Sequence, residues 1–395
     1  MARQAGARKI IAVNQPSGRP GIIRGWLDEY PASFDDADHI IIGQAEGGDQ
    51  TAAAEAQAIL VNCLRNHGRD VISMPDSARL FELISMAADD MASAVEQAAL
   101  SRISVADIQS FTEHLQKSKR ILALLGAGLS ASSGLPTFRG AGGLWRSFDA
   151  TALASPEAFE NNPGLVWQFY SYRRHMALGV EPNKAHYALA ELSRKKKNFI
   201  TLSQNVDGLS PRAQHPPDQL HLLHGSLFDI KCNEFYCNYA RENDFTDPIV
   251  PALEIPKKGL NLPASRENEV DIADAANPVP ELAVADLPRC PKCGGLLRPG
   301  VVWFGEPLPG DTIKTVDDWI DEGPIDLMLV IGTSSKVYPA AEYTDTARKA
   351  GARIAVINMD PNDKPRKGLK NHDWFFQGDA AVIVPELLKG VIGEV

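Results

Sequence analysis

The chain has 395 residues, of which 44% are hydrophobic and 23% charged, a globular composition that excludes wholesale disorder. Its net charge of −10 has the wrong sign for a protein that binds nucleic acid by neutralising phosphates, and five cysteines are too few for a disulfide scaffold. Its apolar runs are too short to cross a bilayer. We therefore expect a soluble protein of a reducing compartment that contacts neither nucleic acid nor membrane directly.

Residues 1–104 carry no recognisable chemical motif and are predicted to form a partly ordered N-terminal extension. Residues 1–27 hold five basic side chains and no acid, whereas 28–104 hold fourteen acids and four arginines. The basic start is compatible with an organelle transit peptide, and a solvated tail is the alternative. One helix is predicted here, over 77–100.

From Val105 the pattern becomes regular. Ile108, Phe111 and Leu115 recur at helical spacing. Short apolar runs that predict buried strands follow at 121–125, 199–203, 325–331 and 353–357. Buried strands that alternate with helices predict an α/β fold with a Rossmann-like, doubly wound parallel sheet. The proline-rich stretch between Cys237 and Cys290 predicts a loop-rich insertion outside that sheet.

A glycine loop follows the first of these strands. Gly126, Gly128 and Ala131 fit the dinucleotide-binding pattern G-x-G-x-x-G/A, in which backbone N–H groups approach a pyrophosphate and a following helix N-terminus favours its charge. A tight structural turn is the alternative. The acidic ribose partner expected about twenty residues later is missing, and a flexible loop over 135–143 follows instead. An ordinary dehydrogenase is therefore disfavoured.

A polar cluster follows the second strand. Gln204, Asn205 and Asp207 could hydrogen-bond ribose hydroxyls and a carboxamide at a strand C-terminus, whereas a capped helix start would explain only one of them. His224 stands beside a glycine shortly afterwards and is the natural general base near neutral pH.

Four cysteines stand in two pairs at zinc-ligand spacing, Cys232-x4-Cys237 and Cys290-x2-Cys293. Four thiolates would close a tetrahedral shell, so the sequence predicts one structural zinc ion. A redox Cys-x-x-Cys is the rival interpretation, but it leaves the first pair unexplained. Cys63 is expected to be a reduced thiol without a role.

Together with further motifs, this order of residues resembles the sirtuins, the NAD-dependent protein lysine deacylases, from Val105 to the C-terminus. The further motifs are Phe138-Arg139, Phe304-Gly305-Glu306, Gly332-Thr333-Ser334 and Asn358. The resemblance implies a catalytic domain over 105–395. Its Rossmann-like part would comprise about 105–140, 195–230 and 300–395. Its small domain would comprise about 141–194 together with a zinc module at 231–299.

The resemblance also implies roles for individual residues. The residues implied to bind NAD are Gly126, Ala127, Gly128, Ser130, Phe138, Arg139, Gln204, Asn205, Asp207, Gly332, Thr333, Ser334, Asn358 and Ala380. The residues implied to hold an extended substrate peptide by strand addition are Val302, Phe304, Gly305, Glu306, Val337 and Tyr338. His224 and Asn205 would be the catalytic residues.

The mechanism implied by the resemblance is specific. The acyl-lysine carbonyl oxygen attacks C1′ of the nicotinamide ribose and expels nicotinamide. His224 then acts as general base on a ribose hydroxyl, and the products are free lysine, nicotinamide and O-acyl-ADP-ribose. A dry site strengthens the electrostatic stabilisation of the cationic sugar and excludes water.

Tyr170 and Arg173 resemble the Tyr-x-x-Arg signature of class III sirtuins, which remove succinyl, malonyl and glutaryl groups. The two residues share one face if their segment is helical, and a guanidinium can bind a distal carboxylate bidentately. Ala141 would open the pocket to a longer acyl chain, and Arg174 is expected to be a solvated charge. A surface helix without a binding role is the alternative.

Three other functions remain open at this stage: a plain NAD-dependent deacetylase, an ADP-ribosyltransferase and a non-catalytic NAD-binding module. The family's precedent for this class favours a mitochondrial location over cytosol or nucleus. The expected partners are acyl-lysine proteins or peptides, and the catalytic unit is expected to work as a monomer.

Overall fold

The computed structural model describes the strand residues 10–14, 39–43 and 71–74, then residue 100 and residues 103–137, 144–258 and 269–395. The chain divides into two compact units, Met1–Ala98 and Ala99–Val395. In the first unit the described strands, β1 (Ile10–Asn14), β2 (His39–Gly43) and β3 (Val71–Met74), pair in parallel in the order β1-β2-β3. Most of the helix predicted over 77–100 lies outside the described residues.

The second unit contains a six-stranded parallel sheet. Its strands are β4 (Ile121–Leu125), β7 (Phe199–Ser203), β8 (Leu220–Leu222), β12 (Leu327–Ile331), β13 (Arg353–Asn358) and β14 (Trp374–Gln377). They stand in the order β14-β13-β12-β4-β7-β8, and the chain runs outward from β4 in both directions. This is the strand order of a Rossmann fold, so the predicted fold class is confirmed. The third predicted strand begins two residues later than expected, at Leu327.

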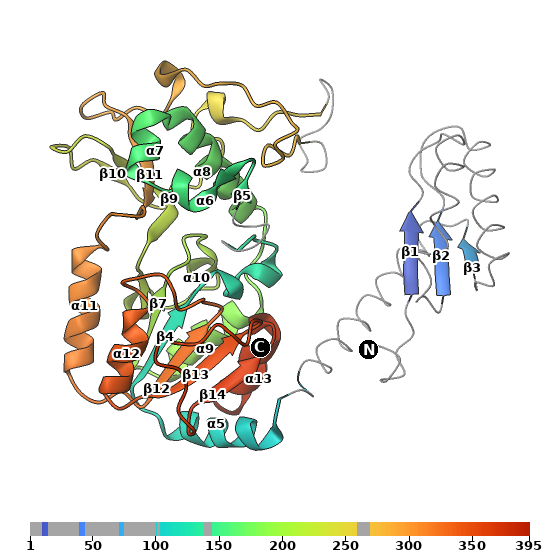
Figure 1. Ribbon diagram of the computed structural model, residues 1–395, viewed down its shortest axis with the longest axis vertical. Coiled ribbons are helices and arrows are strands. Elements are labelled where there is room, and N and C mark those ends of the chain that lie inside the picture. The colour runs from blue at the N-terminus through green and yellow to red at the C-terminus, as the bar shows by residue number, and fades with distance from the viewer. Residues whose placement is uncertain are drawn as a thin grey trace. The chain divides into compact units, whose positions relative to one another are not determined.

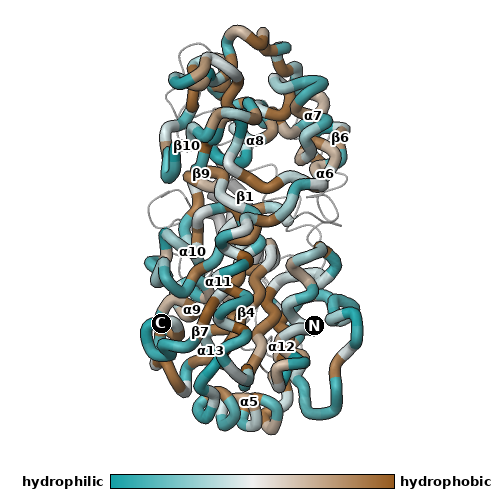
Figure 2. The backbone as a smooth tube through the Cα atoms, turned by 90° about the vertical axis from the view of Figure 1, so that its left-hand side faces the viewer, coloured by the Kyte–Doolittle hydropathy of each residue, from teal (hydrophilic) through white to brown (hydrophobic). Residues whose placement is uncertain are grey.

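Helices cover both faces of the sheet (Figure 1), and apolar side chains of each face pack against them. One face packs against α5 (Val105–Lys117), α9 (Lys184–Lys195) and α13 (Ala380–Ile392). The other packs against α11 (Gly310–Asp321) and α12 (Glu342–Lys349). Strands buried on both faces must be apolar throughout, and β4 and β7 are accordingly brown in Figure 2.

The ends of these helices follow from local sequence. The Ser104 hydroxyl accepts a hydrogen bond from the Asp107 amide and caps α5, and the Asp379 carboxylate caps α13 through the Ala381 amide. The helix α9 packs against the sheet, although residues up to 194 were expected to belong to the small domain. The expected boundary therefore lies too late in the chain, because the apolar face of α9 needs the sheet as its partner.

A small domain has its own core, built around β9 (Gly225–Cys232) and β11 (Leu297–Val301). The strand β10 (Ala240–Arg241) extends this antiparallel sheet, and β5 (Leu144–Trp145) pairs with β6 (Phe148–Asp149). Its helices are α6 (Ala150–Leu153), α7 (Pro156–Asn161) and α8 (Pro163–Leu178), while the short α10 (Leu209–Arg212) follows β7. None of the described helices has the length and apolarity needed to span a bilayer.

Candidate active site

The glycine loop lies where the strand order reverses, between β4 and β12. The amide of Gly126 donates to Ile331 O at 2.9 Å, and that of Gly128 donates to Gly332 O at 2.8 Å. A Cβ atom on Gly128 would lie 2.8 Å from Gly332 Cα, and Gly332 itself has a φ of +60°. Glycine is therefore required for the two loops to touch, and ligands of doubly wound sheets bind at this point.

The segment after the glycine loop differs from the expected helix start. Ala127–Leu129 and Ala131–Ser133 form two short 3₁₀ turns, and Gly134 ends the second in the left-handed region. The prediction of a helix N-terminus behind the loop is wrong. Instead of bonding the backbone of a helix start, the hydroxyls of Ser130 and Ser132 donate to the carboxylates of Asp207 and Asp379, which lie far away in sequence.

Two of the predicted polar residues, Asn205 and Asp207, meet at Ser130, which is buried. The Ser130 hydroxyl donates to Asp207 Oδ2 at 2.7 Å, and the Asn205 side-chain amide lies 3.3 Å from Ser130 Oγ and donates to Gly126 O at 3.0 Å. The Gln204 side-chain amide donates to Thr333 Oγ1 at 3.0 Å. These bonds link the carboxyl ends of β4, β7 and β12. Asp207 Oδ1 also accepts a hydrogen bond from the Leu209 amide at 2.9 Å, at the first residue of α10, so this carboxylate contacts both the helix start and the cluster.

The imidazole ring of His224 is hydrogen-bonded to the backbone of this cluster. Its Nδ1 lies 3.0 Å from the backbone carbonyl oxygen of Gln204. A carbonyl oxygen can only accept, so Nδ1 carries the hydrogen and Nε2 keeps its lone pair. Burial lowers the pKa of His224 below its ordinary value of 6.5, although the bond to Gln204 opposes this shift. The imidazole is therefore neutral near pH 7 and suited to accept a proton at Nε2.

The residues expected at the adenosine end follow β12 and β13. Thr333 is buried, and its carbonyl accepts a hydrogen bond from the Asn358 side-chain amide at 2.8 Å. Ser334 Oγ accepts from the Lys336 amide at 3.3 Å, and Ala380 is the first residue of α13. The structure therefore groups Gly332 and Asn358 at the edge of the glycine loop. Phe138, Arg139 and Ala141 lie outside the described residues.

Tyr170 and Arg173 lie one turn apart on α8, as the spacing predicts. Burial raises the pKa of Tyr170 to about 12, so its phenol remains a hydrogen-bond donor at neutral pH. The Arg173 guanidinium lies 5.4 Å from the Phe169 ring centre and is half-buried. Burial lowers the pKa of Arg173, and Tyr170 and Asp207 act against that shift. Arg173 is thus within electrostatic range of the polar cluster.

The expectation that Arg174 is a solvated charge is wrong. Its side chain is 1% exposed, and its guanidinium donates to the carbonyl oxygens of Leu227, Asp244 and Thr246, the last two at 2.7 and 2.8 Å. These acceptors come from β9 and the insertion that follows it. Arg174 therefore connects α8 to the zinc module by hydrogen bonds. The local sequence does not reveal this role.

The residues expected to hold a peptide lie on two segments. Phe304 and Tyr338 are each 48% exposed, and Gly305 has a φ of +90°. The Val302 amide donates to His224 O at 2.8 Å, and Glu306 binds the Arg298 guanidinium at 2.6 and 2.9 Å. Val337 is half-buried between Lys336 and Tyr338. The segment 302–306 is thereby connected to the backbone of His224 by one hydrogen bond.

The four predicted cysteines converge at one end of the small domain. Their sulfur atoms all lie within 4.8 Å of one another, with 3.5 Å between Cys232 and Cys293 and 3.7 Å between Cys237 and Cys290. Zinc–thiolate bonds of about 2.3 Å in a tetrahedron separate the sulfurs by about 3.8 Å. The donor set and its spacing therefore fit one zinc ion with no open coordination position.

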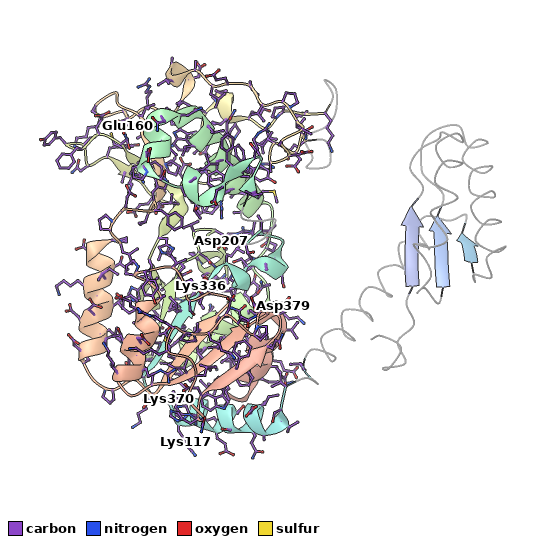
Figure 3. All side chains as sticks on the ribbon, in the orientation of Figure 1. Lys117, Glu160, Asp207, Lys336, Lys370 and Asp379 are labelled. Atoms are coloured by element: carbon purple, nitrogen blue, oxygen red, sulfur yellow. The ribbon has the colours of Figure 1, made fainter. Side chains whose placement is uncertain are left out.

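Sequence reasoning missed several residues that support the site. His186 is buried, and its Nε2 lies 3.4 Å from Ser130 Oγ. Arg298 and Trp303 are buried in the small domain beside Tyr170. Lone His, Arg and Trp residues give no pattern, so only the tertiary structure identifies them. In Figure 3, Asp207 lies between the parallel sheet and the small domain.

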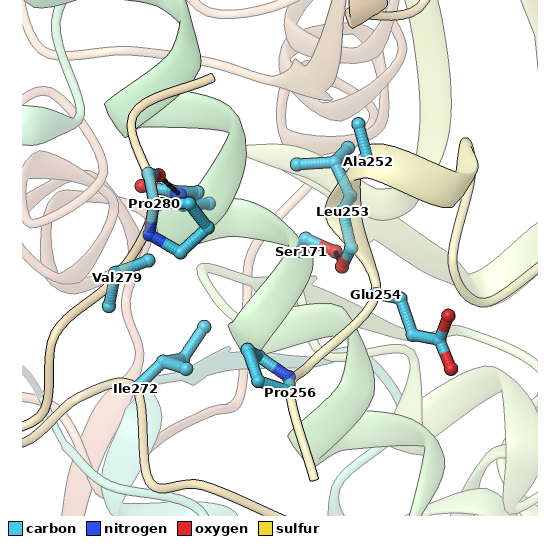
Figure 4. A pocket seen from close by; sticks show the side chains of 9 residues that line it. Ser171, Ala252, Leu253, Glu254, Pro256, Ile272, Val279 and Pro280 are labelled. Atoms are coloured by element: carbon cyan, nitrogen blue, oxygen red, sulfur yellow. Dashed lines mark hydrogen bonds between the residues drawn. The ribbon is translucent and has the colours of Figure 1, made fainter. Parts of the chain in front are cut away.

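A separate small pocket lies beside α8 and contains none of the predicted site residues (Figure 4). It is lined by Gln168, Ser171, Ala252, Leu253, Glu254, Pro256, Ile272, Val279 and Pro280. Ser171 Oγ donates to Leu253 O at 3.4 Å, which joins the helix to the insertion. This pocket belongs to the packing of the insertion on α8.

Known proteins resemble the chain over this whole region. Residues 126–339 match the model of the Sir2 family. An NAD-dependent protein deacylase of Candida albicans is 47% identical over 73% of the chain and 99% of its own length. NAD-dependent protein deacylase sirtuin-5, mitochondrial, of Danio rerio is 39% identical over 72% of the chain and 87% of its length. The crystal structure of a Sir2 homolog–NAD complex is 34% identical, with a TM-score of 0.55 over 72% of the chain and 93% of its own.

Proposed function

Because the chain belongs to the Sir2 family and is an NAD-dependent protein lysine deacylase, we propose that it acts preferentially on lysines carrying acidic acyl groups. The groups concerned are succinyl, malonyl and glutaryl. One observation carries this proposal: Tyr170 and Arg173 lie one helical turn apart on α8, beside the polar cluster that contains Asp207. The proposal extends to the residues of the candidate site, including Ala141 as the small residue that leaves room for the longer chain.

The physical chemistry of this pair supports a carboxylate ligand. A guanidinium presents parallel N–H donors that match both oxygens of a carboxylate, and such charge-assisted bonds are about twice as strong as neutral ones. The phenol of Tyr170 stays protonated and adds one donor. An acetyl group offers nothing to either side chain, so binding it would leave the half-buried Arg173 charge without that partner.

The remaining residues bind and activate the two substrates. NAD supplies nicotinamide as the leaving group, and Gly126, Gly128 and Gly332 allow its phosphates to approach the backbone. Asn205 and Asp207 are fixed by Ser130 and would bind the nicotinamide ribose. His224 would take a proton from a ribose hydroxyl at Nε2, because Nδ1 is held by Gln204. The segment 302–306 would hold the peptide beside this base.

The test compares one peptide in its succinyl-lysine and acetyl-lysine forms, with and without NAD, by mass spectrometry. We expect strong NAD-dependent preference for the succinyl form and formation of O-acyl-ADP-ribose, which an ADP-ribosyltransferase would not make. Arg173→Met should lose about 1.5–3 kcal/mol of transition-state stabilisation for the succinyl form, the range for a charged hydrogen bond. It should leave weak deacetylation largely intact.

A control variant and three outcomes complete the test. Arg194→Met removes a more exposed guanidinium on α9 and should leave both activities unchanged. Equal loss of both activities in Arg173→Met would contradict the assignment of the carboxylate pocket. Preference of the wild type for acetyl-lysine would identify a plain deacetylase, and no turnover of either form would favour a non-catalytic NAD-binding module.

We also propose a mitochondrial location, monomeric catalysis and protein or peptide substrates, without direct binding of nucleic acid or membrane. Two observations support the location: several relatives are named mitochondrial, and residues 1–27 are basic and free of acids. The proposed catalytic domain spans 105–395, and residues 1–104 form an extension. Fluorescence of a full-length fusion against a mitochondrial marker tests the location, and a cytosolic or nuclear signal would refute it.

A further inference from the structure

The helix α9 begins with a capping box whose third helical residue is a histidine. The Asn183 side chain accepts a hydrogen bond from the Ala185 amide at 3.0 Å, and the Asn183 backbone amide donates to His186 Nδ1 at 3.3 Å. Glutamate or glutamine ordinarily stands at this position of the box. A glutamate carboxylate could only accept hydrogen bonds, whereas a neutral imidazole has a second nitrogen that can donate one.

The contact with Asn183 fixes the tautomer of His186. A backbone amide can only donate, so Nδ1 keeps its lone pair and Nε2 carries the hydrogen. The side chain is 1% exposed, and burial lowers the pKa of His186 to about 4, although Asp207 acts against this shift. The ring is therefore neutral near pH 7. It has the opposite tautomer from His224, whose hydrogen is on Nδ1.

The Nε2 atom of His186 contacts the hydroxyl of Ser130, and the two atoms lie 3.4 Å apart. The same hydroxyl oxygen accepts from the Asn205 side-chain amide at 3.3 Å, and its hydrogen is donated to Asp207 Oδ2 at 2.7 Å. A hydroxyl has one hydrogen and two lone pairs, so all its hydrogen-bonding positions are used within the protein. Because donors occupy both lone pairs, the hydrogen of Ser130 is directed to Asp207.

The carboxylate of Asp207 is consequently held at both oxygens. Oδ2 accepts from Ser130, and Oδ1 accepts from the Leu209 amide at 2.9 Å. Bonds to different oxygens fix the plane of the carboxylate, and each oxygen keeps a lone pair for a substrate hydroxyl. Ser130 is 2% exposed, so without the imidazole one of its lone pairs would be buried without a donor and its hydrogen could turn away from Asp207.

The cap residue of α9 contacts the same loop. Asn183 Nδ2 donates to Leu129 O at 2.8 Å and to Ser133 Oγ at 3.1 Å, on either side of Ser130 in the chain. The start of α9 is thus joined to the turns after the glycine loop both by its cap and by the imidazole. The cap therefore holds the helical turn that carries His186 against the loop that carries Ser130.

We propose that His186 is a positioning residue for deacylation: its Nε2–H, held in one tautomer by the Asn183 cap, bonds the Ser130 hydroxyl and thereby orients Asn205 and Asp207 for the nicotinamide ribose. His186 touches neither substrate in this role and acts through Ser130. The inference rests on the proposed binding of that ribose by Asn205 and Asp207. It gives Ser130 an indirect part, because its hydroxyl has no hydrogen-bonding position left for NAD.

The tautomer is measured first, on the full-length wild-type protein with isotope-labelled histidine nitrogens. Long-range nitrogen–proton correlation spectra show which ring nitrogen carries the hydrogen, and the signals that vanish in His186→Gln and His224→Ala assign the two rings. We expect the hydrogen on Nε2 of His186 and on Nδ1 of His224. A hydrogen on Nδ1 of His186 would overturn the inference, because that ring cannot accept from Asn183.

The function is tested with His186→Leu and His186→Gln. The dissociation constant for NAD is measured by calorimetry, and KM is measured for both substrates. His186→Leu should raise the dissociation constant and the KM for NAD about tenfold, because a buried acceptor loses its donor, and should change the KM for the peptide less than about twofold. His186→Gln keeps an N–H donor and should bind NAD within about threefold of the wild type.

His215→Leu is the matched control. His215 is also buried, burial lowers its pKa to about 4, and its Nε2 lies 3.0 Å from Thr201 Oγ1 and 3.4 Å from Ser193 Oγ. Among the described residues, its hydrogen-bond partners include none that we propose to bind NAD. This variant should lower the melting temperature, as His186→Leu does, but should leave the dissociation constant for NAD unchanged.

The other outcomes overturn the inference. Unchanged NAD binding in His186→Leu, or an equal loss in His186→Leu and His186→Gln, would leave the imidazole with a packing role only. An equal loss in His215→Leu would show that destabilisation alone weakens NAD binding. If His186→Leu does not fold, the tautomer of the wild type and the NAD binding of His186→Gln still decide.

Asp207→Asn separates this inference from the proposal on which it rests. Normal NAD binding by Asp207→Asn would refute the proposed role of Asp207, and the inference would fail with it. Weakened NAD binding by Asp207→Asn together with normal binding by His186→Leu would overturn the inference alone.

Discussion

Arg173 and Arg174 are neighbours in sequence on α8, yet their guanidinium groups serve different parts of the molecule. Arg173 lies over Phe169 within electrostatic range of Asp207, whereas Arg174 is enclosed by carbonyl groups of β9 and the insertion. The same turn of α8 therefore provides one guanidinium group to the candidate acyl site and one that attaches the helix to the zinc module. Substitution of Arg173 should therefore change acyl specificity, whereas substitution of Arg174 should lower the stability of the fold.

Arg174→Met should lower the free energy of unfolding by about 3 kcal/mol or more, because it leaves the carbonyl groups of Leu227, Asp244 and Thr246 buried without their donor. Urea denaturation followed by circular dichroism measures the change. Arg173→Met is the matched reference and should lose less than about 1 kcal/mol. Equal destabilisation by the two variants would show that the bonds from Arg174 to these three carbonyl groups add nothing to the free energy of unfolding.

The catalytic activity should fall at acid pH, where His224 becomes protonated. Its pKa lies below 6.5 because burial disfavours the imidazolium, so the base stays neutral to lower pH than an exposed histidine would. We expect kcat/KM to be constant through pH 7 and to fall only as the pH drops below 6.5. His224→Ala should lower kcat by about 10²- to 10⁴-fold. An acid limb centred above pH 7 would contradict this environment.

His175 should stabilise the fold only while it is protonated. Its Nδ1 lies 2.7 Å from Asp247 and its Nε2 lies 2.9 Å from Glu269, and the bond to Asp247, opposed by burial, raises the pKa of His175 above 6.5. A raised folded-state pKa means that this stabilisation is complete below pH 6.5 and is lost as the pH rises through the higher value. The difference in unfolding free energy between wild type and His175→Gln should accordingly shrink from pH 6 to pH 9. A difference that grew with pH would reverse the sign assigned here.

Removal of zinc should unfold the small domain. The cysteine sulfurs lie at zinc-ligand spacing, and metal binding at such sites contributes directly to folding. Elemental analysis should find one zinc per chain, and Cys290→Ser should lose it together with part of the near-ultraviolet circular dichroism. Cys63→Ser is the control and should keep the metal. Retention of full zinc content by Cys290→Ser would exclude a four-thiolate site.

Gly332→Ala should disrupt the contact between the two loops at the switch point. Its Cβ atom would lie 2.4 Å from Leu129 N, and its φ of +60° disfavours alanine. We expect at least a tenfold rise in the dissociation constant for NAD, measured by calorimetry, with a lower melting temperature. Gly323→Ala, at a position with open space around it, should affect neither quantity. Unchanged NAD binding in Gly332→Ala would show that the loop tolerates a wider separation.

The sequence predicted the strands that are buried along their whole length. It missed the features that depend on contacts with residues far away in the chain. Continuous apolar runs such as Ile121–Leu125 can only be strands covered on both faces, and the cysteine spacing fixes a metal site without further information. The burial of Arg174 depends on carbonyl groups up to 72 residues away, and the serine hydroxyls in the turns after Gly126 bond carboxylates that are farther away still in sequence. Neither leaves a periodic signal. The roles of the individual site residues remain predictions.

The bond from the Val302 amide to His224 O joins the base to the segment expected to receive the peptide. This one hydrogen bond sets the spacing between the backbone of that segment and the residue that carries Nε2. A substitution that moves the backbone of 302–306 should therefore also move His224, so broader substrate range and efficient proton transfer oppose each other in this architecture. Changes at Val337 and Tyr338, on the other segment expected to hold the peptide, leave this bond intact and should alter substrate range without moving His224.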